Sequence, residues 1–210
     1  MLCSGKMGFG DGLKRRRNIG RGKRMRRMVS WRWRIKLAAL ALFLFCLSLY
    51  LPGTVSATRM VLNVPEFSQQ PYDQICWATR ASMIIAYFKG DTVDRDVTIA
   101  QLKYGSNFNQ PGTLADSEYY VRYYTGRPGS IQYNALSYTA VQYQINKLSP
   151  IGTRISWAVG GAHAQVIKGY DTATGWVIYN DPWDGLGHGC SYSYYVNNSS
   201  WSWTGSLFYA

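Results

Sequence analysis

The sequence predicts an α+β domain, because helical periodicity in its first part gives way to strand patterns in its second. From Cys76 to Phe88, apolar residues recur at the i, i+4, i+7, i+8 and i+11 positions of an amphipathic helix. From Thr153 onward, short runs rich in Val, Ile, Tyr and Trp are separated by Gly, Pro, Asn and Asp. Helices followed by antiparallel strands are typical of the α+β class.

The first part is expected to contain three helices after a short strand. Pro65 ends that strand, because proline cannot donate a hydrogen bond to a neighbouring strand. Asp73 lies near the start of the first helix, and Gly90 ends it. The expected elements are a strand over 61–64 and helices over 76–89, 116–124 and 134–148.

The second part is expected to contain five strands, joined by turns. A five-residue loop from Asp171 to Gly175 joins the second and third strands into a hairpin. In such a pair the start of one strand lies beside the end of the other. We therefore expect His163, which opens one strand, to lie next to Asp181, which follows the other. The expected strands cover 154–159, 163–170, 176–180, 190–196 and 206–209.

The net charge of +12 comes entirely from the N-terminal segment. Residues 1–57 contain 13 of the 23 Lys and Arg residues and one acid, Asp11, which leaves 10 basic and 10 acidic residues in 58–210. A basic patch for nucleic acid would therefore lie outside the expected domain, and we expect no nucleic-acid partner.

The same segment has the pattern of an export signal. Basic residues at 32, 34 and 36 precede an apolar run over 37–51, and Val55-Ser56-Ala57 supplies small residues at −3 and −1 of a cleavage site. The run is shorter than the roughly 20 residues of a membrane-spanning helix. We expect a basic region and signal over 1–57, a domain over 58–210 and secretion of the mature chain. An uncleaved membrane anchor is the alternative.

After cleavage only Cys76 and Cys190 remain. In an oxidising compartment two cysteines favour a disulfide. The alternative is chemical: a thiol at the N-terminus of a helix is favoured as thiolate. A thiolate nucleophile needs a base and a group that orients the base. His163 and Asp181, brought together by the hairpin, supply both.

Three short motifs occur in order along the chain. They are Gln70-x5-Cys76-Trp77-Ala78, then Gly160-Gly161-Ala162-His163-Ala164 with Gly169-Tyr170, and finally Asp181-Pro182-Trp183. Together they resemble the papain-like cysteine peptidases over about Val64 to Pro182. The branch that they resemble contains the double-glycine leader peptidases of bacteriocin exporters and a secreted effector protease of a plant pathogen.

This resemblance implies a papain-like fold, in which a helix carrying the nucleophilic Cys packs on an antiparallel sheet carrying His and Asp. It implies Cys76 as nucleophile, His163 as general base and then acid, and Asp181 as the residue that orients the imidazole. Gln70, with the backbone N–H of Cys76, would form the oxyanion hole. Gln69 is one residue too far from the cysteine for the family spacing. We expect a peptide or protein substrate, no cofactor, no metal and a monomer.

Two other functions are compatible with the same residues. Transglutaminases and peptide-amide hydrolases transfer acyl groups with Cys, His and Asp, and a secreted binding domain could retain the fold without activity. His188 and Cys190 are two potential metal ligands, but zinc in proteins usually has four ligands, so we do not expect a zinc site there. Trp157 is expected either to line a substrate cleft or to pack in the core.

Overall fold

A computed structural model of the chain describes residues 31, 33–43 and 57–210. The chain divides into two compact units, Met1–Val55 and Ser56–Ala210. In the first unit, residues 33–43 form a helix. Most of the expected export signal, including Val55-Ser56 of its cleavage site, lies outside the described residues. No helix among the described residues is long and apolar enough to cross a membrane.

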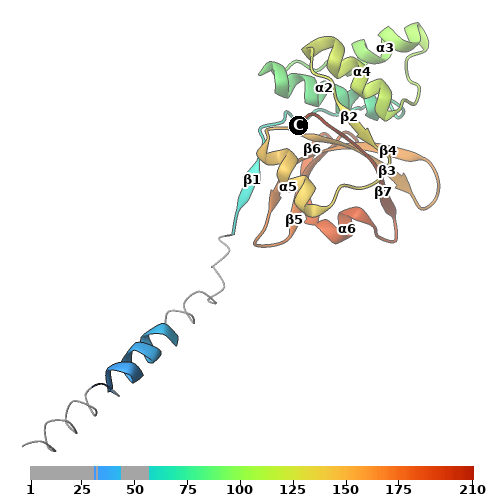
Figure 1. Ribbon diagram of the computed structural model, residues 1–210. Coiled ribbons are helices and arrows are strands. Elements are labelled where there is room, and N and C mark those ends of the chain that lie inside the picture. The colour runs from blue at the N-terminus through green and yellow to red at the C-terminus, as the bar shows by residue number, and fades with distance from the viewer. Residues whose placement is uncertain (1–30, 32, 44–56) are drawn as a thin grey trace, which may run out of the picture. The chain divides into compact units, whose positions relative to one another are not determined.

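The second unit combines a group of helices with an antiparallel sheet (Figure 1). Helix α2 packs against α3, α4 and strand β4, so it lies between the other two helices and the sheet. Helix α5 contacts strands β1, β3 and β4, and helix α6 contacts strands β5, β6 and β7. The helices are α2 (Cys76–Lys89), α3 (Asp96–Tyr104), α4 (Leu114–Thr125), α5 (Tyr138–Asn146) and α6 (Tyr192–Val196), with a 3-10 turn at Gly105–Asn107.

The sheet is antiparallel at every pairing, in the order β2-β7-β3-β4-β5-β6. Strand β1 pairs with the last residues of β4, and β7, which is last along the chain, lies between β2 and β3. The strands are β1 (Arg59–Val61), β2 (Ser130–Gln132), β3 (Ile151–Trp157), β4 (Ala162–Asp171), β5 (Trp176–Asp181), β6 (Leu186–Ser191) and β7 (Trp201–Phe208).

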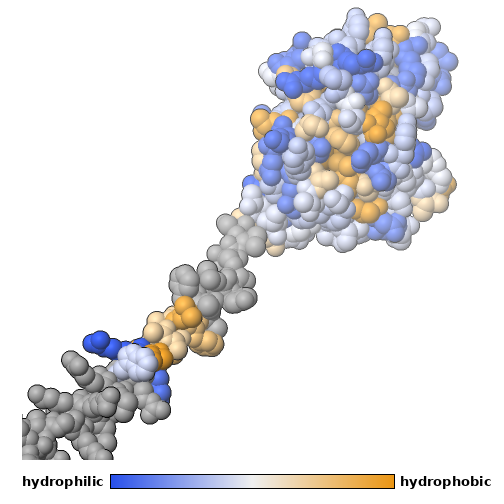
Figure 2. Space-filling view, in the orientation of Figure 1, coloured by the Kyte–Doolittle hydropathy of each residue, from blue (hydrophilic) through white to orange (hydrophobic). Residues whose placement is uncertain are grey.

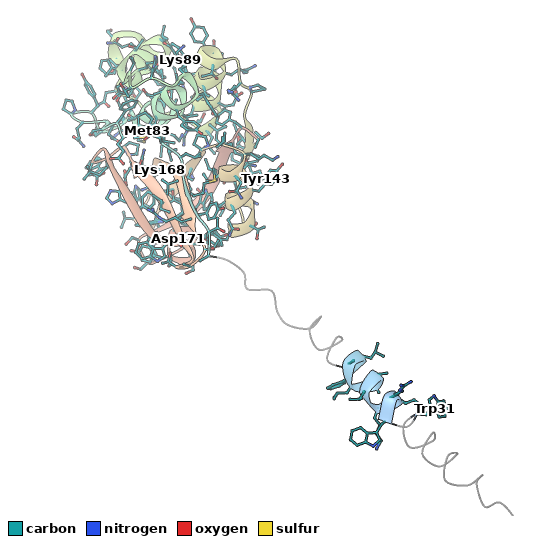
Figure 3. All side chains as sticks on the ribbon, turned by 90° about the vertical axis from the view of Figure 1, so that its left-hand side faces the viewer. Trp31, Met83, Lys89, Tyr143, Lys168 and Asp171 are labelled. Atoms are coloured by element: carbon teal, nitrogen blue, oxygen red, sulfur yellow. The ribbon has the colours of Figure 1, made fainter. Side chains whose placement is uncertain are left out.

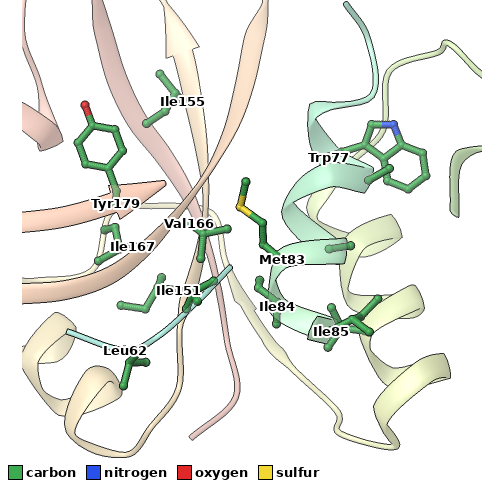
Figure 4. Packing of buried hydrophobic residues seen from close by; sticks show 14 of the residues in the cluster. Leu62, Trp77, Met83, Ile84, Ile85, Ile151, Ile155, Val166, Ile167 and Tyr179 are labelled. Atoms are coloured by element: carbon green, nitrogen blue, oxygen red, sulfur yellow. The ribbon is translucent and has the colours of Figure 1, made fainter. Parts of the chain in front are cut away.

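The core lies where α2 meets the sheet. Figure 4 shows Met83 and Ile84 directed from α2 toward the strands, and Trp77 directed away from them. The Trp77 ring contacts the rings of Tyr104 and Tyr120, on α3 and α4. All residues of α2 from 77 to 86 are buried, which explains why this helix has an apolar pattern on more than one face. Each large apolar side chain so buried contributes about 1.5–3 kcal/mol.

The same layering is visible from other views. In Figure 3, Lys89 lies in the helical part and Lys168 in the sheet, with Met83 at the boundary between them. Figure 2 shows apolar residues gathered at the level where helices meet strands, whereas the surface of the helical part is mostly hydrophilic. The two layers therefore share one apolar interface.

The α+β class, the helix that begins at Cys76 and the hairpin around 171–175 are confirmed. Gly90 ends α2 in the left-handed conformation, with φ of 67°. The first strand, expected over 61–64, is Arg59–Val61, so it ends before Pro65 is reached and Pro65 is not the residue that ends it. The helix expected over 134–148 is shorter, because Ser137 caps it by accepting a hydrogen bond from the backbone N–H of Ala140.

One expected strand is wrong. Of the expected strand over 190–196, only Cys190 and Ser191 belong to a strand, because β6 ends at Ser191 and the Ser191 hydroxyl accepts a hydrogen bond from the backbone N–H of Tyr194. This cap begins the short helix α6, which the aromatic and β-branched composition of 192–196 did not indicate. Helix α3 was not expected either, because only Asp96, Ile99 and Ala100 in it are buried and its apolar pattern is weak.

Candidate active site

Cys76 is the first residue of α2 and is half-buried. The helix has no side-chain cap, and within the described residues the backbone N–H groups of Cys76 and Trp77 have no acceptor. Free N–H groups at a helix N-terminus favour a negative charge. Asp73, expected near the helix start, does not cap it and instead accepts a hydrogen bond from Asn109.

His163 and Asp181 are neighbours, as the hairpin register predicts. His163 is the second residue of β4, and Asp181 is the last residue of β5. The Nε2 atom of His163 lies 2.6 Å from Oδ1 of Asp181. The Cys76 thiol lines the same cleft as the imidazole and interacts with it, and this interaction favours the charged form of each group. Because Nε2 faces the carboxylate, Nδ1 is the nitrogen available to the sulfur.

The Asp181 carboxylate is held by two further donors. Its Oδ1 accepts the backbone N–H of Trp183 at 2.9 Å, and its Oδ2 accepts Nε2 of Gln165 at 2.7 Å. Gln165 lies two residues after His163 on β4 and therefore on the same face of the strand. Three hydrogen bonds fix the carboxylate, and the carboxylate in turn fixes the orientation of the imidazole.

The charges of these groups support one another. Burial raises the pKa of the Cys76 thiol, but the hydrogen bond and charge of His163, the charge of Arg80 and the Ala164 N–H together lower it below the ordinary value. Burial opposes the charge on His163, yet its bonds to Asp181 and Cys76 raise its pKa to about 9. Each group therefore favours the charged form of the other, a thiolate beside an imidazolium.

Arg80 lies one turn after Cys76 on α2 and is almost fully buried, with 2% of its surface exposed. Its guanidinium donates to the carbonyl oxygens of Thr153 at 3.0 Å and Thr113 at 3.1 Å, and to the Ser117 hydroxyl. All of these acceptors are neutral. Burial lowers the pKa of Arg80 to about 10, which leaves it charged at neutral pH beside the thiol.

A cleft of about 390 Å³ opens at Cys76, His163 and Asp181. Trp157, whose place was open between cleft and core, lines it and stacks on the imidazole, with ring centroids 6.0 Å apart. The remaining lining residues are Asp73, Ala162 and Trp183. The stacked ring shields one face of His163 from water, which strengthens its hydrogen bonds.

Gly160 and Gly161 have a different role from the expected one. We expected small residues before His163 to let the cysteine helix approach closely. A Cβ atom at either glycine would contact nothing within 4 Å, but both have positive φ, 95° and 86°. They form the turn between β3 and β4, which sets where His163 enters its strand.

The two adjacent glutamines lie in different environments. Gln70, expected at the oxyanion hole, is exposed, and its Nε2 donates to the Trp183 carbonyl oxygen at 3.2 Å. Gln69 is 1% exposed, its Nε2 donates to the Tyr72 carbonyl oxygen, and its Oε1 has no partner within the described residues. Neither glutamine is among the residues that line the cleft.

The disulfide alternative for Cys76 is not realised, because Cys76 and Cys190 are both free thiols. Burial raises the pKa of Cys190 to about 11, so the two thiols differ strongly in their tendency to ionise. His188, the other potential metal ligand near Cys190, is bonded to Asp184 at 2.9 Å.

Sequence reasoning missed two residues of the site, Arg80 and Gln165. A signal for each was present. Arg80 follows Cys76 by four residues and therefore lies on the same face of the helix. A charged residue is seldom buried on such a face unless partners satisfy its charge or hydrogen bonds. Gln165 follows His163 by two residues in a strand, so its side chain lies on the same side of the sheet. The thiol, imidazole and carboxylate in contact can deliver a nucleophilic sulfur to an electrophilic carbon and move a proton.

Comparisons with known proteins identify the family and the fold of the chain. A family model described as papain-like cysteine protease AvrRpt2 matches residues 58–200. Among solved structures, a putative C39-like peptidase from Bacillus anthracis is 17% identical, with a TM-score of 0.51, and the match covers 73% of this chain and 98% of that chain. At this identity the likeness concerns the fold, which is papain-like.

A second solved structure, UfSP from C. elegans, is 13% identical with a TM-score of 0.38, and the match covers 76% of this chain and 35% of that chain. A score this low supports no argument. No curated protein matches the chain.

Proposed function

The chain belongs to the papain-like cysteine protease AvrRpt2 family and is a cysteine peptidase; on that premise, we propose that it hydrolyses peptide bonds with Cys76, His163 and Asp181. The observation that carries this proposal is the 2.6 Å hydrogen bond between Asp181 and His163, in a cleft where the imidazole faces and interacts with the Cys76 thiol. A base held by a carboxylate and in contact with a thiol is what nucleophilic catalysis by cysteine requires.

The proposed reaction begins with the thiolate of Cys76. Its sulfur attacks the peptide carbonyl carbon, a C–S bond forms, and the carbonyl π electrons move to the oxygen. As the tetrahedral species collapses, the C–N bond breaks and His163 gives its proton to the leaving amine. Water then gives a proton to His163 and attacks the thioester. The C–S bond breaks, which releases a carboxylic acid and restores the thiolate.

We propose that the oxyanion is stabilised by the backbone N–H of Cys76 and by the Gln70 amide. The free N–H groups at the start of α2 support the first donor. Gln70 has the family spacing, but its amide now donates to Trp183, at the rim of the cleft, and would exchange that bond for one to the oxyanion. Gln69 is the alternative, because it is adjacent and buried; its Nε2 donates to the Tyr72 carbonyl oxygen and would have to exchange that bond for one to the oxyanion.

Alanine variants of the two glutamines distinguish these assignments. Loss of an oxyanion donor lowers kcat by about 10²–10³. Gln70→Ala should show that loss at an unchanged thermal midpoint, because the residue is exposed. If Gln69→Ala loses activity and Gln70→Ala does not, the side-chain donor is Gln69.

Secretion is also a proposal. It is supported by the pattern of basic and apolar residues over 1–57, with a mature chain that starts near Thr58 and acts as a monomer on peptides or proteins outside the cytoplasm. N-terminal sequencing of the exported chain tests the cleavage site. A product that retains residues 37–51 would favour the uncleaved anchor, and contact with a membrane would then occur through that segment.

The reactivity of the thiols provides the first test of the triad. At about pH 5.5 an ordinary thiol is almost entirely protonated. Iodoacetamide should nevertheless label Cys76, because its pKa is lowered, and should leave Cys190 unlabelled, because its pKa is raised. Cys190→Ser is the matched control and should retain full labelling and activity. An unlabelled Cys76 would favour an inactive binding domain.

A peptide library completes the test. The wild type should cleave peptides and Cys76→Ala should not. The dependence of kcat/KM on pH should rise as Cys76 ionises and fall as His163 loses its proton near pH 9. Incorporation of a labelled amine into casein without cleavage would replace hydrolysis by acyl transfer as the function.

A further inference from the structure

A second cavity opens beside Cys76. Its volume is about 350 Å³, and it is continuous with the cleft described above, with which it shares Asp73, Cys76, Trp157, Ala162 and His163. Its other walls come from the start of α2, from residues 111–114 at the start of α4, and from β3 and β4 around their connecting turn. A peptide whose scissile carbonyl lies at Cys76 brings one of its neighbouring side chains to this cavity. A role for the cavity in choosing substrates therefore rests on the proposed function.

Two guanidinium groups line this cavity, Arg80 and Arg154. Arg80 is buried and bonded to neutral oxygens, as described above. Arg154, on β3, is exposed, and its Nη1 donates to the hydroxyls of Ser156 at 2.6 Å and Thr204 at 2.7 Å. Within the described residues neither arginine forms an ion pair with a carboxylate.

The cavity therefore carries an excess of positive charge. Its one carboxylate, Asp73, accepts a hydrogen bond from Asn109 and, among the residues that the structure describes, is not paired with either arginine. An uncompensated cation next to a substrate cleft attracts a negative group and repels a positive one.

Arg154 is held ready for such a group. The hydroxyls of Ser156 and Thr204 lie 2.8 Å apart and both contact the same guanidinium nitrogen. The guanidinium has five N–H donors in a planar fork, so the donors on Nη2 and Nε remain for a ligand. Because two hydroxyls already restrict the side chain, less conformational entropy is lost when a carboxylate binds.

We propose that this cavity selects an acidic side chain, Asp or Glu, at one position of the peptide substrate near the scissile bond, with Arg154 as its direct partner. Arg80, which is almost fully buried, contributes positive charge to the cavity without contacting the substrate side chain. The cavity walls combine apolar atoms of Pro111 and Leu114 with the two arginines. We therefore do not expect the cavity to select apolar substrate side chains over others. Specificity here comes from the charge that the substrate residue carries.

A library of peptides varied at each position around the cleaved bond tests this proposal. Wild type should prefer Asp or Glu at one position by about 10- to 100-fold in kcat/KM over the neutral amide residues, the range of a charge-assisted hydrogen bond. Arg154→Gln should reduce that preference to near unity. Arg154→Glu should invert it in favour of Lys or Arg at the same position. Because Arg154 is exposed, both variants should fold, and their thermal midpoints check this.

Lys147→Glu is the matched control, because Lys147 is an exposed cation that lines neither cavity. It changes the net charge by the same amount and should leave the preference unchanged. An acidic preference that persists in Arg154→Glu, or a wild type that cleaves peptides with no acidic preference, overturns the inference. Failure of the proposed function is distinguishable, because then no peptide is cleaved and iodoacetamide does not label Cys76 at about pH 5.5.

Discussion

The helical wall and the sheet wall of the cleft each bring one cation to Cys76, and they hold it in different ways. The sheet supplies His163, whose charge depends on a carboxylate in contact and whose pKa is about 9. The helices supply Arg80, which has only neutral acceptors within the described residues and stays charged at neutral pH. In the proposed mechanism the sheet wall therefore moves protons, whereas the helical wall supplies a constant positive charge.

The largest effect should follow from removing the carboxylate on the sheet side. Asp181→Ala leaves His163 buried without its partner, so its pKa falls and the imidazolium is lost at neutral pH. We expect kcat/KM to fall by about 10²–10⁴ and the alkaline limb of the pH profile to move to lower pH. Asp184→Ala is the matched control, because Asp184 is exposed, pairs with His188 and should be dispensable for activity. Activity within a few-fold of wild type in Asp181→Ala would remove this residue from the triad.

A smaller effect is expected when the permanent cation is removed from the helical side. Arg80→Met takes away a charge that lowers the pKa of Cys76, so the pKa rises and alkylation begins at higher pH. A rise of about one unit lowers the rate of iodoacetamide labelling about tenfold at acidic pH. The variant should also lose about 2–4 kcal/mol of stability, because buried carbonyl groups lose their donor.

Arg80→Lys separates the two effects, since it keeps the charge but not the fork of donors. It should restore much of the thiol reactivity at low pH while it remains less stable than wild type. A pH profile of labelling that is the same in wild type and Arg80→Met, with reduced stability, would leave Arg80 with a packing role alone.

The smallest effect is expected at Asp96, a buried carboxylate of the helical wall that forms no ion pair with a cation among the described residues. Burial and the charge of Asp94 raise the pKa of Asp96 to about 6, the opposite of the shift at Asp181. The folded state therefore holds a proton more tightly than the unfolded state, and this group makes stability fall as pH rises from about 4 to 6. Asp96→Asn should gain about 1–2 kcal/mol at pH 7.5 and nothing at pH 4.

Urea unfolding at both pH values measures this difference, and kcat/KM should not change. An equal effect of Asp96→Asn at pH 4 and pH 7.5 would show that ionisation of Asp96 is not the cause. Because Thr79 on α2 donates to Asp96 on α3, a change in activity would instead show that the contact between these helices controls Cys76.

The contacts that could be predicted from the sequence are those set by local geometry. The pairing of His163 with Asp181 follows from two strands and a five-residue loop, and the position of Cys76 follows from a helical period that begins at a loop. The order of the strands does not follow from alternation, because a period of two shows that a strand exists but not which strand it pairs with. Hence the position of β7 between β2 and β3 was not predicted.

For the cation on the helical side, helical periodicity places Arg80 on the face of α2 that carries Cys76 but does not indicate its hydrogen-bond partners. Its role depends on acceptors from two separate parts of the chain, Thr113 and Ser117 at the start of α4 and Thr153 on β3, and only the tertiary structure brings these together. Burial of an arginine costs free energy unless its guanidinium is hydrogen-bonded. An arginine in an apolar helix therefore indicates that hydrogen-bond acceptors lie nearby, but it does not indicate which residues provide them.

The interior position of β7 has a consequence for biosynthesis. Strand β3, which pairs with the His163 strand, has β7 as its other neighbour, and Trp203 and Leu207 of β7 are buried in the core. A ribosome that has reached only Asp181 has made every residue of the proposed triad, but the sheet still has an unfilled gap. We expect such a nascent chain to remain unfolded and without peptidase activity, which would protect the cell that makes it until synthesis of the chain is complete.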